Sequence, residues 1–206
     1  LSQYKNSMDT YQVDLLNDTD IETSIKAALG NGPIDGFIHS VSHSLDMKSF
    51  SDLDWNDFQS QINLQTRSFF NITKSVIPSM KSRKYGKIIS ILTNAVTEKP
   101  PSNMSDYLVG KYSLLGLTKS LAVELERFNI MVNGISPSMV DTNLIANLPN
   151  KFKEIAASQS PTGKLTTPDD IASVALFLCS NQADHVSGEN VVVSGGTHKS
   201  LKINTK

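Results

Sequence analysis

Tyr107 and Lys111 are the two residues whose types and spacing suggest chemistry most directly. They lie four positions apart in a run that is predicted to be helical from Tyr107 to about Arg127, and one helical turn places both side chains on the same face. An ammonium held close to a phenol stabilises the phenolate and lowers the pKa of the hydroxyl, which can then exchange a proton near neutral pH. Such a group handles the proton that accompanies a hydride in an oxidoreductase. The same spacing also occurs on ordinary amphipathic helices with a solvated lysine, so the surrounding sequence must decide.

Short apolar runs alternate with longer helical patterns along the chain, and these elements must position the pair. Strands are predicted at residues 34–41, 86–92, 130–135 and 190–193, and helices at residues 20–29, 53–82, 107–127 and 168–180. Strands that are apolar along their length and separated by helices indicate a parallel sheet covered on both faces. The predicted fold class is α/β, a doubly wound parallel sheet in three αβα layers, with ligands at the carboxyl ends of the strands.

Local signals add detail to this outline. Residues 11–14 are predicted to be the end of a strand that precedes the first helix. Thr19 and Glu22 have the spacing of a capping box for that helix, and Pro78 is predicted to break or kink the second helix. The segment 137–167 is predicted to be irregular.

Composition narrows the class of protein. With 206 residues, of which 39% are hydrophobic, the chain is long enough for one sizeable core and too short for two comfortable domains. The 19 basic and 20 acidic residues form no long block and leave a net charge of −1, which argues against nucleic acid or an anionic membrane as a partner. No apolar run approaches the roughly 20 residues that span a bilayer. The single cysteine, Cys179, cannot form an internal disulfide and fits a cytoplasmic setting.

Seven signals occur in a fixed order between Asp14 and Gly196. They are Asp14 after a strand, Trp55 before Asn63, Gly86-Lys-Ile-Ile, Tyr107 with Lys111, Val132-Asn133, Pro137 with Thr142, and Gly195-Gly196. In this order the chain resembles the short-chain dehydrogenase/reductase family, the single-domain Rossmann-fold enzymes that use NAD or NADP, and the match is to the ketoacyl-reductase type. The resemblance implies one Rossmann-type domain over residues 1–206, with a substrate lid at 143–167 and a loose tail at 197–206.

The resemblance assigns catalytic roles to four residues. Tyr107 matches the acid/base, and Lys111 matches the lysine that lowers its pKa and binds the nicotinamide ribose. Thr93 falls where the family usually has a substrate-orienting serine; threonine keeps the hydroxyl but adds a methyl group, and it can instead serve only to cap a turn. Asn63 matches the asparagine that holds a water in a proton relay to the lysine, unless it is simply a solvent-exposed helix residue.

The resemblance also implies contacts to NAD(H) or NADP(H). Asp14 falls where the family places an aspartate near the adenine ring, although a loop aspartate before a helix explains it nearly as well. Ser40 and Ser42 lie where the backbone passes the cofactor ribose, and Pro137 and Thr142 match positions near the pyrophosphate and carboxamide. Preference between the two cofactors cannot be read from the chain, because the residue that decides it would lie in a segment before Leu1.

The chain departs from the family pattern in four places. The usual Asn-Asn-Ala-Gly reads His39-Ser-Val-Ser42, Pro-Gly reads Pro137-Ser138, and Asp-Gly-Gly reads Ser194-Gly-Gly. The fourth departure is the lack of a Gly-x-x-x-Gly-x-Gly loop, which presents backbone amides to the pyrophosphate. About one strand-helix-strand unit, on the order of 40 to 50 residues, is therefore missing from the N-terminal side, and we expect the natural protein to contain it or to obtain it elsewhere.

His39 and His43 have a spacing that invites comparison with metal sites. They fall at a strand end and in a loop rather than on one helix face, and no cluster of carboxylates or cysteines accompanies them. Metal ligand sets normally need three or four such groups. No metal site is predicted.

The resulting expectation is an NAD(P)-dependent enzyme that reduces a carbonyl, first of all a 3-oxoacyl group or ketone, or oxidises the corresponding alcohol. The alternative within the same superfamily is an enoyl-thioester reductase, suggested by His39-Ser40. An alternative of another class is a catalytically inactive binding or structural partner with the same fold. By resemblance, the helices that carry Asn63 and Tyr107 form a homodimer or homotetramer interface. The identity of the small-molecule carbonyl, alcohol or acyl thioester cannot be read from the sequence.

Overall fold

The structure is a computed structural model and describes residues 8–197. Its centre is a four-stranded parallel sheet in the order β1-β2-β3-β4. The strands are β1 (Gly36–His39), β2 (Gly86–Ile91), β3 (Ile130–Pro137) and β4 (Asn190–Val193). All four match predicted strands, although β1 is shorter than the predicted run. Residues 11–14 form no strand, so that prediction is wrong; Val13 instead packs against the core without a strand neighbour.

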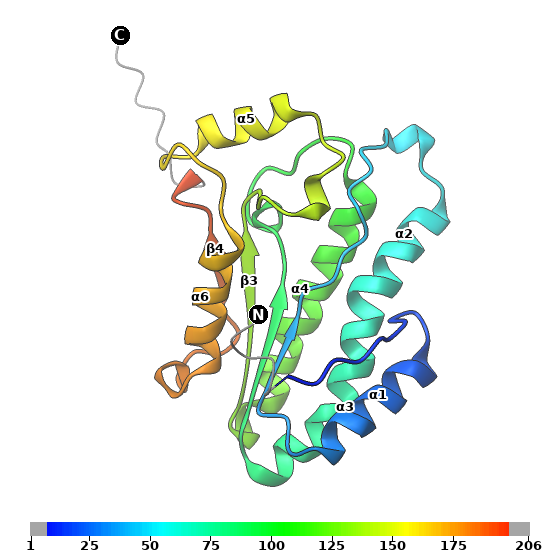
Figure 1. Cartoon of the computed structure of the whole chain (residues 1–206), viewed down its shortest axis with the longest axis vertical. Helices are drawn as coiled ribbons and strands as arrows, with labels where there is room; N and C mark the ends of the chain where they lie inside the picture. Colours follow the sequence, from blue (N-terminus) through cyan, green and yellow to red (C-terminus); the bar gives the residue numbers. More distant parts are fainter. Residues whose placement is uncertain (1–7, 198–206) are drawn as a thin grey trace.

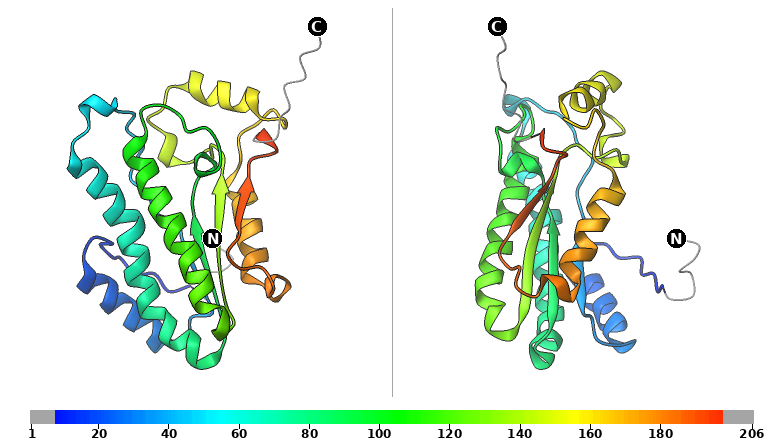
Figure 2. Two further views of the ribbon diagram at one scale, coloured as in Figure 1. Left: turned by 180° about the vertical axis from the view of Figure 1, so that it is seen from behind. Right: turned by 90° about the vertical axis from the view of Figure 1, so that its left-hand side faces the viewer.

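Helices cover both faces of the sheet, which confirms the three-layer fold class. On one face lie α1 (Asp18–Gly30), α3 (Ser68–Arg83) and α4 (Ser105–Leu125), and on the other lies α6 (Pro168–Cys179). Neighbouring side chains of β2 point to opposite faces: Ile88 joins the core with Phe69 and Leu114, whereas Ile89 joins the core beneath α6. The edge-on view in Figure 2 shows α4 and α6 on opposite sides of the strands.

The long helical region is interrupted at a different place from the one predicted. It begins with a 3-10 turn, η2 (Phe50–Asp52), followed by α2 (Trp55–Ile62), a π-helical turn, η3 (Asn63–Arg67), and α3. α3 is unbroken at Pro78, so the predicted break there is wrong. Pro78 has no N–H group to donate to the carbonyl of Lys74. Both residues are exposed, so water can satisfy that carbonyl.

The segment 137–167 is more ordered than predicted. It contains a 3-10 turn, η6 (Asn143–Ile145), and a helix, α5 (Asn150–Gln159), which lies across the carboxyl ends of the strands (Figure 1). α5 has no side-chain cap at its N-terminus and no buried residue, so its sequence carries little of the usual helix signal.

The remaining elements are three 3-10 turns: η4 (Asn94–Val96), η5 (Glu126–Phe128) and η7 (Asn181–Ala183). The predicted tail, 197–206, lies outside the described residues except for Thr197. Within residues 8–197, no helix combines the length and apolarity required to cross a bilayer.

The first helix is capped by a different residue from the predicted one. The side-chain oxygen of Asn17 accepts hydrogen bonds from the backbone amides of Thr19 and Asp20, at 3.0 and 3.3 Å. Thr19 already lies inside the helix, and Glu22 forms an ion pair with Lys26. The capping box predicted from Thr19 and Glu22 is therefore wrong, because the helix begins two residues earlier.

This cap gives a testable difference between two neighbouring positions. Asn17→Ala removes the acceptor for two helix-terminal amides and should lower the free energy of unfolding by about 1 kcal/mol. Thr19→Ala removes no cap and should change it by less than about 0.5 kcal/mol. Urea denaturation of the two variants measures both values, and a larger loss for Thr19→Ala than for Asn17→Ala would contradict the assignment.

Candidate active site

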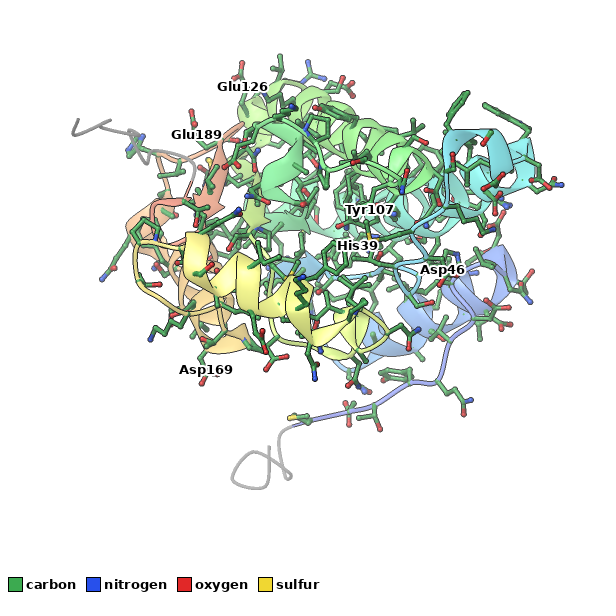
Figure 3. The ribbon with its side chains drawn as sticks, turned by 90° about the horizontal axis from the view of Figure 1, so that it is seen from above. His39, Asp46, Tyr107, Glu126, Asp169 and Glu189 are labelled. Carbon is green, nitrogen blue, oxygen red and sulfur yellow. The ribbon has the colours of Figure 1, made fainter. Side chains whose placement is uncertain are left out.

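A cavity of about 1,060 Å³ opens at the carboxyl ends of β1, β2 and β3. Of the residues that the sequence singled out, it is lined by Ser40, Ser42, Thr93, Tyr107, Lys111, Pro137 and Thr142. Figure 3 looks down on this end of the molecule and labels Tyr107 near the middle. The structure therefore brings seven of the nine predicted site residues to one cavity, at the place where open parallel sheets bind ligands.

Lys111 is a buried cation held by the backbone. Its side chain is 3% exposed, and its Nζ donates hydrogen bonds to the carbonyls of Ile91 and Val41, at 2.9 and 3.5 Å. Burial lowers the pKa of Lys111 to about 8, because removal from water disfavours the charged form. The last residue of β2 and the segment just after β1 therefore hold the ammonium in place.

Tyr107 is also buried, and its pKa moves in the opposite direction from the sequence prediction. Burial raises the pKa of Tyr107 to about 12, and a hydrogen bond with Thr93 lowers it only in part. The Nζ of Lys111 lies 5.7 Å from the centre of the tyrosine ring and donates its hydrogen bonds to backbone carbonyls. The predicted net lowering of this pKa is therefore wrong here, because burial outweighs the groups that favour the phenolate, and Tyr107 is neutral at physiological pH.

Thr93 lines the cavity and also caps a turn. Its hydroxyl lowers the pKa of Tyr107, which places it beside the phenol, and it accepts a hydrogen bond from the backbone amide of Ala95 at 3.4 Å, which caps η4. Two hydroxyl groups that face one cavity can bind the same substrate oxygen. A neutral phenol can give its proton to such an oxygen, and an ammonium nearby can stabilise the negative charge left behind.

Two predicted residues lie away from the cavity lining. Asn63 is partly buried in the π-helical turn η3, which packs against α4. Asp14 is exposed, and its carboxylate accepts the amide of Leu16 at 2.9 Å in the turn before α1. The geometry of Asp14 is that of the loop alternative.

The two histidines considered as a metal pair have separate partners. The Nε2 of His39 lies 3.0 Å from the carbonyl of Gln65, and the Nε2 of His43 lies 3.0 Å from the hydroxyl of Ser60. In the described part of the chain, no group of three or more His, Cys, Asp or Glu residues is arranged to hold a metal ion.

The helix that carries the pair is fixed on two sides. Toward the sheet, the hydroxyl of Thr118 lies 2.8 Å from that of Ser90 on β2. Toward the π-helical turn, the hydroxyl of Ser113 lies 2.6 Å from that of Thr66. α4 is therefore held by polar contacts with the sheet and with the π-helical turn, in addition to its apolar face.

Sequence reasoning missed the apolar part of the cavity. It is lined by Leu45, Met47, Met104, Met139, Leu144, Leu148 and Phe152. Several of these come from the predicted lid, 143–167, in which Phe152 and Ala156 lie one turn apart on α5 and both face the cavity. That spacing was the available signal, and it was weak because α5 itself was not predicted.

The sequence of the chain is similar to those of known reductases. The family model described as "Enoyl-(Acyl carrier protein) reductase" matches residues 2–198. The chain is 32% identical over 140 residues to a 3-oxoacyl-[acyl-carrier-protein] reductase, FabG, of Thermotoga maritima, a match that covers 68% of this chain and 56% of that protein. It is 36% identical over 142 residues to the dehydrogenase/reductase SDR family member 4 of Sus scrofa, over 68% of this chain and 50% of that protein.

A solved structure shows the same fold. A 7α-hydroxysteroid dehydrogenase complexed with NADH and 7-oxo glycochenodeoxycholic acid has a TM-score of 0.85 and 29% sequence identity, over 93% of this chain and 75% of that one. The matches to the two relatives span about half the length of each. The family model, the relatives and the fold agree, and the chain belongs to the short-chain dehydrogenase/reductase family.

Proposed function

We propose that the protein is an NAD(P)(H)-dependent oxidoreductase that reduces a carbonyl group, or oxidises the corresponding alcohol, in this cavity. The observation that carries the proposal is the set of Tyr107 and Lys111, both buried, with the half-buried Thr93, in the cavity at the carboxyl ends of the strands. A phenol and a hydroxyl that line one cavity beside a buried ammonium form a site for a substrate oxygen that gains negative charge and then a proton.

The residues of this end of the cavity fit the nicotinamide and ribose part of a dinucleotide. Lys111 supplies an ammonium, Ser40, Ser42 and Thr142 supply hydroxyl groups, and all of them line the cavity. Such groups can bind ribose hydroxyls and the carboxamide, and Pro137 closes one wall beside them. When bound there, the nicotinamide supplies or accepts the hydride. We extend the same proposal to Asp14 as an adenine contact.

The chain's own residues then handle the proton. In the reducing direction Tyr107, neutral because burial raises its pKa, donates its proton to the substrate oxygen while Thr93 orients that oxygen. Lys111 stabilises the phenolate that remains, and we propose that Asn63 supports the relay that returns a proton through Lys111. In the oxidising direction the same groups act in reverse.

The apolar lining supports an acyl or similarly apolar substrate, and a 3-oxoacyl thioester is the first candidate. The relative from Thermotoga maritima is named for that substrate class. Enoyl-thioester reduction is the second candidate, because the matching family model carries that description and His39-Ser40 takes the place of the usual Asn-Asn. We also propose a cytoplasmic location, on the basis of the single cysteine.

Replacing the tyrosine tests the catalytic assignment. Tyr107→Phe removes the proton donor and keeps the ring, so kcat for reduction of an acetoacetyl thioester by the full-length protein should fall by about 10² to 10⁴-fold. Binding of NADH or NADPH should change by less than about twofold, since the phenol acts on the substrate oxygen. Cofactor absorbance measures the rate, and fluorescence titration measures binding.

Tyr112→Phe is the matched control on the same helix. Tyr112 is 47% exposed and its hydroxyl lies 3.5 Å from the carbonyl of Ala95, so this variant should keep the wild-type rate. A Tyr107→Phe variant as active as Tyr112→Phe would refute the assignment. Turnover of a crotonyl thioester alone would favour the enoyl candidate, and failure of the full-length protein to bind either cofactor would favour the inactive partner.

We further propose that the protein is a homodimer or homotetramer that uses the outer face of α4. Val109 and Val123 are 39% and 70% exposed on this helix, and their separation of fourteen residues places them on one face. Trp55, 68% exposed at the start of α2, extends the apolar surface, because α2 packs beside α4.

A charge on this face should separate the subunits. Val123→Asp would place a carboxylate in the buried interface, and we expect it to convert the oligomer to a smaller species at micromolar concentration. Val123→Ile keeps the apolar surface and should leave the oligomer unchanged. Light scattering after size-exclusion chromatography gives the masses, and a monomeric wild-type protein would refute the proposal.

A further inference from the structure

Side chains reach two carbonyl groups of the π-helical turn η3. In this turn the amide of Ser68 donates to the carbonyl of Asn63, five residues back, so the carbonyl of Leu64 loses the amide that an α-helix would give it. The hydroxyl of Ser68 donates to Leu64 instead. The next carbonyl, that of Gln65, lies 3.0 Å from the Nε2 of His39. A carbonyl can only accept, so His39 is the donor.

His39 is well suited to donate this hydrogen bond, although its Nε2 also lies 3.4 Å from the hydroxyl of Ser68. Its side chain is 1% exposed, and its ring packs against Phe37 and Phe69 with centroid separations of 5.9 and 5.4 Å. Burial lowers the pKa of His39 to about 4, which keeps the imidazole neutral at physiological pH. A neutral imidazole carries one proton, and the contact with Gln65 places that proton on Nε2.

Gln65, the residue that His39 holds, is wedged against the helix that carries the catalytic pair. Its side chain is fully buried and donates to Gln61 at 2.6 Å, and Gln61 donates to Asp106 at 3.3 Å. Asp106 directly precedes Tyr107. A Cβ on Gly110 would come within 3.0 Å of the Gln65 amide, so the turn and α4 are closely packed at this position.

We propose that His39 is a positioning residue for the reaction, in that its hydrogen bond to Gln65 fixes the π-helical turn against α4 and so sets the placement of Asn63 and Tyr107. This proposal rests on the proposed function. In this chain a histidine reaches the turn from the end of β1.

The segment that follows His39 also contacts Lys111. His39 is the last residue of β1, and Val41, two residues later, supplies one of the carbonyls that hold the Lys111 ammonium. The donor of His39 itself acts on the turn, so its loss should loosen the turn and leave the backbone contact of Lys111 in place. A displacement of this kind costs turnover more than cofactor binding, because proton transfer depends steeply on geometry.

Two variants of the full-length protein separate the donor from the ring. His39→Phe keeps a ring of similar shape and loses the N–H, whereas His39→Gln keeps an N–H at a similar reach and loses the ring. We expect His39→Phe to lower kcat about tenfold or more, with KM and the cofactor Kd within about twofold of wild type, and His39→Gln to restore kcat to within about threefold. Rates are compared at a temperature where thermal denaturation shows every variant folded.

The opposite pattern overturns the proposal. A folded His39→Phe with the wild-type kcat, or a folded His39→Gln as slow as His39→Phe, would show that the hydrogen bond does not position the site. Parallel losses of kcat and cofactor affinity would indicate a structural role only.

A second measurement needs neither a folded variant nor activity. In wild-type protein with ¹⁵N-labelled histidine rings, NMR should show His39 as the neutral Nε2–H tautomer from pH 8 down to pH 5. The Nδ1–H tautomer, or protonation with a midpoint near that of a free histidine, would overturn the proposal. A wild-type protein without turnover on any substrate would count against the proposed function, and this spectrum would still test the hydrogen bond.

Discussion

The site depends on holding a charged lysine out of water at the ends of two strands. Lys111 is 3% exposed, and its ammonium is held by the carbonyls of Ile91 and Val41. Lowering its pKa from 10.5 to about 8 corresponds to a cost on the order of 3 kcal/mol for keeping it charged. A sheet whose strands end together supplies the two carbonyls, and a helix packed across that end supplies the lysine.

This constraint explains the construction around α4. The helix must lie close enough to β2 for Lys111 to reach Ile91, and the hydroxyl contact between Thr118 and Ser90 fixes it there. It must also leave room for the π-helical turn, which Gly110 allows because any larger residue would meet the Gln65 amide. Contacts on both sides of the helix thus offset the free-energy cost of burying the site. This is a common feature of functional sites.

The sequence predicted the sheet and the cavity residues because those signals are local or ordered along the chain. Each strand appears as an apolar run, whereas Thr93 and Tyr107 could be assigned to one site because the ordered motifs of the chain resemble those of the family. The pKa of Tyr107 could not be predicted, because it depends on how completely other elements cover the phenol. The π-helical turn was also beyond reach: it is decided by partners such as His39, which is far from Gln65 in sequence, and Pro78 was the stronger local signal.

The central claim is that burial, rather than the lysine, sets the protonation of Tyr107, so that a neutral phenol is the proton donor. Ultraviolet difference titration of the cofactor-free wild-type protein against Tyr107→Phe measures this directly, since phenolate absorbs where phenol does not. With burial dominant, the extra phenolate of the wild type should appear only with an apparent pKa well above 10, near the value of about 12 given by the structure. A Tyr107 phenolate that forms near neutral pH would contradict the account and restore the lysine as the controlling group.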